Sequence, residues 1–80
     1  MKRFLRALLR IHAAVDRTQA IQIAMQHASE RGWPWVEPVH VSEGLTKIHV
    51  MTNAANRGGN ANIWVAITTG EVIHSGFASR

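Results

Sequence analysis

The change from helix to sheet lies within residues 20–52, which read AIQIAMQHASERGWPWVEPVHVSEGLTKIHVMT. Before Gly32 the sequence contains no glycine or proline, and residues of high helix propensity dominate. Gly32 supplies the left-handed conformation that ends many helices. Beyond it, the period of the apolar residues changes from 3.6 to 2. We therefore expect a helix followed by antiparallel strands.

The helical part is expected to break near residues 16–18. A helix from about Thr18 to Arg31 follows, and either Thr18 or Asp16 accepts hydrogen bonds from its first-turn amides. Its predicted buried stripe consists of small or apolar residues: Ala20, Ile21, Ala24, Met25 and Ala28.

Four strands are expected at residues 36–42, 46–52, 61–68 and 71–77. A two-residue turn at Glu43-Gly44 predicts that Val39 lies opposite Ile48 and that Val41 lies opposite Thr46. Short connections between such elements favour an α+β fold, in which the N-terminal helix or helices pack on one face of a four-stranded antiparallel sheet. The predicted core is Ile21, Ala24, Val39, Val41, Ile48, Val50, Val65 and Ile67, with Trp33 and Trp35 over its open end.

The positive charge is concentrated at the N-terminus. Residues 1–17 carry the whole formal net charge of +4, through Lys2, Arg3, Arg6, Arg10 and Arg17 against Asp16. Apolar residues recur there at helical spacing, so we divide the chain into a basic amphipathic helical segment, 1–17, and a single α+β domain, 18–80. Arg6 and Arg10 interrupt the apolar region that a signal peptide requires, which favours a retained segment and a cytoplasmic protein.

Residues 18–75 resemble the PepSY domains and related cystatin-like α+β modules. The similarity lies in the helix Thr18-Gln19-Ala20-Ile21-Gln22-Ile23-Ala24 and in the final hairpin Thr69-Gly70-Glu71-Val72. Ala66 stands where that family has an aspartate, and the basic segment is not part of the usual unit. The resemblance implies a noncatalytic domain, which in known members is often an inhibitory or regulatory segment of a secreted peptidase.

No arrangement of side chains points to catalysis. The chain has no cysteine, and its five carboxylates are dispersed at turns and element ends. The five histidines lack the spacing of metal ligands on a helix; His40 and His49 are expected to be solvated strand residues. We expect no catalytic residue, metal, cofactor or small-molecule substrate.

Candidate binding residues lie outside the predicted core. Trp64 alternates out of phase with Ile63 and Val65, so it is expected with Met51 on the sheet face that the helix does not cover. Arg57-Gly58-Gly59-Asn60 forms either an anion-binding nest or a flexible connection. These patterns predict a noncatalytic binding or regulatory module with a protein partner, or a homodimer through the Trp64 face. Cover of that face by the N-terminal helix of the same chain is the alternative to the homodimer. The alternative is a protein that binds nucleic acid or an anionic membrane surface through residues 1–17, with Arg6 and Arg10 as contacts.

Overall fold

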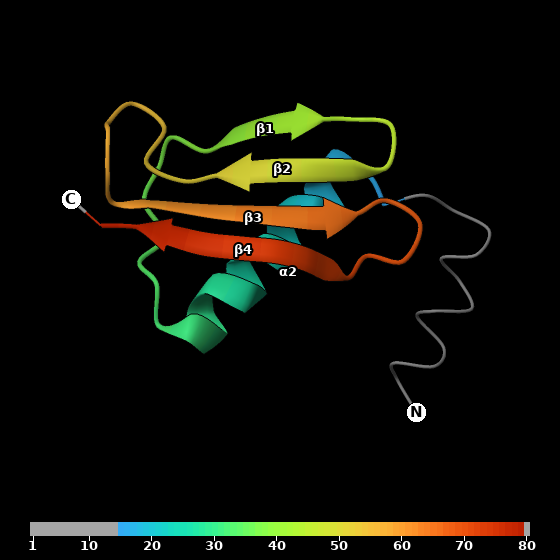
Figure 1. The fold of residues 1–80 in the computed structure, drawn as a ribbon, viewed down its shortest axis with the longest axis horizontal. Helices are drawn as coiled ribbons and strands as arrows, with labels where there is room; N and C mark the ends of the chain where they lie inside the picture. Colours follow the sequence, from blue (N-terminus) through green and yellow to red (C-terminus); the bar gives the residue numbers. More distant parts are fainter. Residues whose placement is uncertain (1–14, 80) are drawn as a thin grey trace.

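The computed structural model describes residues 15–79 and shows one helix packed on one face of an antiparallel sheet (Figure 1). The elements are α2 (Arg17–Arg31), β1 (His40–Glu43), β2 (Lys47–Met51), β3 (Asn60–Ala66) and β4 (Val72–Ala78). The strands follow one another in the sheet in the order β1-β2-β3-β4. The predicted α+β fold is confirmed.

Helix α2 begins at a capping box. The Asp16 side chain accepts a hydrogen bond from the Gln19 amide at 2.8 Å, and the Gln19 side chain accepts one from the Asp16 amide at 2.9 Å. Asp16 is therefore the N-cap, and the helix begins at Arg17. Gly32 ends the helix with a φ of 73°. Val15 and Asp16 are not helical. The amphipathic helix predicted before them falls on residues outside the described range, so the break between two helices stays a prediction.

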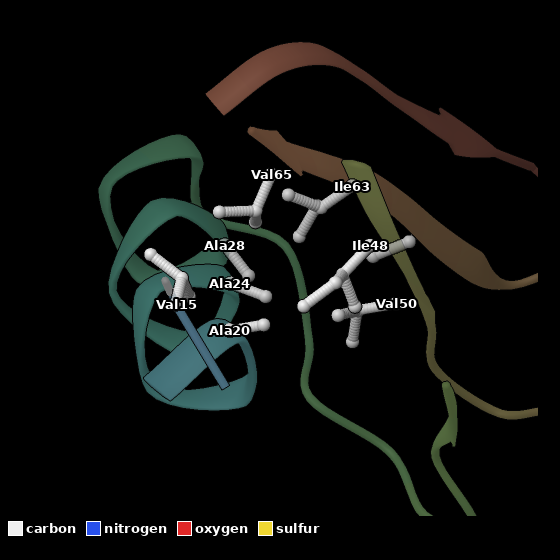
Figure 2. Close-up of a cluster of buried hydrophobic side chains, with 9 residues drawn as sticks. Val15, Ala20, Ala24, Ala28, Ile48, Val50, Ile63 and Val65 are labelled. Atoms are coloured by element: carbon white, nitrogen blue, oxygen red, sulfur yellow. The ribbon is translucent and has the colours of Figure 1, made fainter. Parts of the chain in front are cut away.

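The core lies between α2 and the two central strands. Ala20, Ala24 and Ala28 are buried and point toward Ile48, Val50, Ile63 and Val65 of the sheet (Figure 2). Because alanine has only one side-chain carbon, the helix approaches the sheet closely.

The predicted helix stripe was wrong at Met25. This side chain is 46% exposed, and Ile21 is only half-buried. Successive residues are rotated by about 100° around a helix, so a stripe centred on Ala20, Ala24 and Ala28 turns Met25 toward solvent.

The predicted register of the first hairpin was also wrong. Val41 lies opposite Val50 and Glu43 opposite Ile48. The connection is three residues long, and the Gly44 amide donates to the Lys47 carbonyl at 2.8 Å. The register differs from the prediction by an even number of residues, so the apolar side chains still face α2. Val39 and Ile67 pack against the core from just outside the strands.

The connection between β2 and β3, residues 52–59, is organised by Asn60. Its side-chain amide donates to the carbonyl oxygens of Thr52 and Asn53, both at 2.8 Å. The Thr52 hydroxyl accepts from the Ala61 amide at 2.8 Å. Thr52, Asn53 and Asn60 are all buried. The segment is thus closed by internal hydrogen bonds rather than held only at its ends.

Within residues 15–79, no helix combines the length and apolar character needed to cross a membrane.

Candidate binding surface

The sheet face opposite α2, here called the far face, is built by the alternating residues of the four strands. In β2 and β3 every second residue is buried against the helix, which places the residues between them on the far face. The pairing of β1 and β4 with these strands extends the same face. Its residues are His40, Ser42, Lys47, His49, Met51, Asn62, Trp64, Ala66, His74 and Gly76.

Three aromatic rings form a row across the far face. His49 and His74 lie opposite Trp64 on the two neighbouring strands. The His49 ring is stacked on the indole, with centroids 4.3 Å apart and an interplanar angle of 10°. The His74 ring lies 4.9 Å from the indole and is tilted by 52°. We call these three residues the aromatic row; its imidazoles flank Trp64 from both sides, which leaves the indole half-buried.

The histidines of β1 and β2 differ from the solvated pair that the sequence predicts. His49 lies opposite Ser42, and its Nε2 donates to Asn62 Oδ1 at 2.9 Å. His49 is half-buried by these contacts, whereas His40 is exposed and hydrogen-bonds with Ser42 Oγ at 3.2 Å. The prediction of a solvated His49 was wrong because the register between β2 and β3 places this residue against Trp64 and Asn62.

A shallow groove of about 280 Å³ runs beside the aromatic row. It is lined by Asn62, Trp64, His74, Gly76, Phe77 and Ala78. Gly76 lies opposite Asn62, and a Cβ atom added to it would meet no heavy atom within 4 Å. The missing side chain at Gly76 therefore leaves open space at the margin of the sheet.

The far face bears cationic or titratable nitrogen groups and no carboxylate. Lys47, His40, His49 and His74 belong to it. Glu43, the only acidic residue within a strand, lies opposite buried Ile48 and forms an ion pair with Arg17 of α2 at 3.6 Å. The far-face residues named above thus include Lys47 and three histidines and no acidic residue.

The structure brings together two of the five predicted binding residues. Trp64 and Met51 both lie on the far face, as expected. Arg57 is exposed in the connection between β2 and β3, apart from that face. Arg6 and Arg10 lie outside the described residues.

The anion-binding nest considered for residues 57–60 is not formed. The Gly58 amide donates to Asn60 Oδ1 at 2.9 Å, and the Gly59 amide donates to the Ala78 carbonyl at 2.6 Å. Both glycine amides are therefore engaged within the protein and do not point at an open anion site.

No metal-binding cluster of three or more histidine, cysteine or acidic side chains occurs in residues 15–79. The two imidazoles of the aromatic row are separated by the indole, so they do not converge on a common point. The aromatic row instead presents three rings that carry nitrogen atoms, beside the groove at Gly76.

The sequence does not predict that His74 and Gly76 belong to this surface. Their place follows from the register between β3 and β4, which contains an irregularity at Trp64 and Val65. Strict alternation along β4 does not reveal that irregularity. Comparison of the chain with protein-family models, curated proteins and solved structures finds no match.

Proposed function

We propose that the protein is a noncatalytic binding or regulatory module that contacts a protein partner through the far face. The observation that carries this proposal is the aromatic row, which places a half-exposed indole at the centre of a sheet face that α2 does not cover. Tryptophan is enriched in protein interfaces because it buries a large apolar area and keeps a polar N–H group at its edge. A regulatory role of the PepSY kind remains the prediction of the sequence resemblance.

The polar surroundings of Trp64 also bear on the partner. Around it lie His49, Asn62 and Lys47, and none of them is acidic. A complementary partner surface would present carboxylates around an apolar centre. His49 and Asn62 hydrogen-bond to each other, but a purely apolar partner that buried the Lys47 ammonium group would leave it without a hydrogen bond, which costs free energy.

The experiment compares three immobilised forms of the full chain in capture from cell extract: wild type, Trp64→Ser and Leu45→Ser. Leu45 is fully exposed in the turn between β1 and β2, so its variant removes an apolar side chain away from the row. We expect a protein retained by wild type and by Leu45→Ser and lost with Trp64→Ser. The purified pair should then show binding at least about tenfold weaker for Trp64→Ser.

Two results would contradict the proposal. Equal retention by all three forms would remove Trp64 from the binding surface. Reproducible hydrolytic turnover by the purified chain, abolished by a single histidine or glutamate substitution, would exclude a noncatalytic module.

A second candidate function is nucleic-acid binding, favoured by the absence of carboxylates from the far face and by the basic residues 1–17. The His49 ring is stacked on the indole and the tilted His74 ring lies 4.9 Å from it, which leaves less of the flat surface on which unpaired bases stack. The discriminating measurement is fluorescence anisotropy with a random single-stranded oligonucleotide. Affinity that falls steeply with salt and disappears when residues 1–14 are removed would favour this function over a protein partner.

A further inference from the structure

The two outer strands of the sheet differ in how they are protected against pairing with another chain. Strand β1 has four residues, ends at the charged Glu43, and follows Pro38 closely. Short length, charge and proline are the features by which natural sheets protect an edge. Strand β4 has seven residues, Val72–Ala78, and contains neither a charged residue nor a proline. Its irregularity near Val72 and Ile73 is the one such feature that it has.

The outer edge of β4 is open in the described part of the chain. Figure 1 shows β4 as the last strand of the sheet, and its element contacts are with β3 and α2. Helix α2 reaches β4 through side chains: His27 hydrogen-bonds with Ser75 Oγ at 2.9 Å. Trp33, just after the helix, stacks with Phe77 at 6.1 Å. No hydrogen bond from residues 15–79 reaches the outer backbone edge of residues 74–77.

We infer that β4 pairs antiparallel with β4 of a second copy of this chain, about a two-fold axis at Ser75. This register places residues 73–77 of the two copies opposite one another, up to the irregularity next to Val72. It also keeps far face beside far face, since directly opposed residues in a sheet point to the same side. The two sheets join into one sheet of eight strands.

Two features of β4 fit each other in this register. His74 of one copy lies opposite Gly76 of the other, where the missing side chain leaves the open groove. Ile73, which is 53% exposed in the single chain, lies opposite Phe77 of the second copy. The two-fold axis repeats each contact. The uncharged strand also brings no like charges together.

The spacing of His74 and Gly76 favours a second copy of the chain over an unrelated extended peptide. Any extended chain satisfies the backbone groups of an edge strand. In β4, His74 precedes Gly76 by two residues. When two copies pair, His74 of each copy therefore lies in the groove beside Gly76 of the other, which an unrelated peptide without this spacing does not reproduce. The interface is one strand wide, so we expect a weak, reversible dimer, with a dissociation constant on the order of 10 µM.

Sedimentation velocity of the full chain, from about 1 to 300 µM so as to bracket that constant, tests the inference with two edge variants. Ile73→Lys places a charge on each edge, and Gly76→Val adds side-chain atoms at the groove, where a Cβ atom meets no heavy atom within 4 Å. We expect each variant to raise the dissociation constant at least about tenfold. Leu45→Lys, in the turn between β1 and β2 and away from the β4 edge and the groove, is the matched control and should leave the dissociation constant unchanged. Circular dichroism must show the same helix and sheet content in all forms.

Crosslinking tests the register itself. The chain has no cysteine, so Ser75→Cys introduces a single thiol at the proposed axis. Opposed Cβ atoms in an antiparallel pair are about 5 Å apart, close enough for a disulfide or a short bismaleimide. Ser42→Cys, on the other edge strand, is the control. We expect a crosslinked dimer with Ser75→Cys and monomer with Ser42→Cys.

Three results would overturn the inference: a wild-type monomer over the whole concentration range, a dimer that both edge variants leave intact, or equal crosslinking at the two cysteines. A dimer lost with His49→Ala and retained with Ile73→Lys would instead assign self-association to the far face. His49 lies on β2, away from the β4 edge, so this variant also separates failure of the partner surface from failure of the edge pairing.

Discussion

Asn60 shows at the scale of a single residue how one side chain orders a segment that composition describes only as a loop. Its amide group donates to the carbonyls of Thr52 and Asn53, and its Oδ1 accepts from the Gly58 amide. Asn53 has a φ of 51°, a conformation that asparagine tolerates better than most residues. The start of β3 and the end of β2 are therefore tied together by buried hydrogen bonds.

This network predicts a large cost for Asn60→Ala. The substitution leaves buried carbonyl oxygens without donors, which costs about 2–3 kcal/mol of unfolding free energy. Asn56→Ala, in the same segment, removes an exposed side chain that donates to Asn53 Oδ1 at 2.7 Å, and should cost less than about 1 kcal/mol. Urea denaturation monitored by tryptophan fluorescence measures both. Equal decreases in the free energy of unfolding for the two variants would show that the buried hydrogen bonds of Asn60 do not stabilise the protein more than the exposed one of Asn56.

The sequence predicts the sheet face on which Trp64 lies but not the residues that surround it. Its phase relative to Ile63 and Val65 places it on the far face, and the structure confirms that position. Its neighbours in the row come from other strands, at distances of 15 and 10 residues along the chain. Only the strand registers bring His49 and His74 to the indole, and local pattern does not determine them.

At the scale of the element, α2 is held to the sheet by three alanines. Ala20, Ala24 and Ala28 have essentially no exposed surface, and the helix packs with them against valine and isoleucine side chains (Figure 2). Large residues at these positions would push the helix away from the sheet. The small residues thus set the distance between the two layers of the fold.

Replacing Ala24 by leucine is therefore expected to destabilise the protein. Overpacking a tight core costs about 1–3 kcal/mol, and Ala24 is 0% exposed. Met25→Leu, one residue further along, is the control and should change the free energy of unfolding by less than about 0.5 kcal/mol, because Met25 is 46% exposed. Thermal or urea denaturation distinguishes the two. Equal effects would favour the stripe that includes Met25, as the sequence predicts.

The elements themselves were largely predictable because their signals are local. Gly32 marks the end of α2, Thr69 and Gly70 mark the last turn, and alternation marks the faces of β2 and β3. The first hairpin was harder. Glu43 and Gly44 are typical of a two-residue turn, but the connection has three residues, and the Gly44 amide donates a hydrogen bond to the Lys47 carbonyl. Sequence pattern fixes the face of a strand more firmly than its register, because a shift by two residues leaves every side chain on its original face.

On the scale of the whole molecule, charge and fold are separated along the chain. Residues 15–79 contain four arginine or lysine residues against five carboxylates, whereas the full chain carries a net charge of +4. The excess of positive charge therefore lies outside the described range. Within residues 15–79, in contrast, Val15, the three alanines of α2 and the apolar residues of β2 and β3 bury one another.

This separation predicts that a chain lacking residues 1–14 folds and changes chiefly in charge. Core packing supplies most of the stability of a small domain, and none of the core side chains named above is removed. We expect its circular dichroism spectrum to show the same elements, and its Tm to fall by less than about 5 °C, which corresponds to about 1 kcal/mol for a domain of this size. At the same time, removal of Lys2, Arg3, Arg6 and Arg10 leaves equal numbers of cationic and acidic side chains. Retention on a cation-exchange column at neutral pH should be largely lost. An unfolded fragment would show that residues 1–14 contribute to the core, and their segment would then have to be assigned to the fold rather than to a partner.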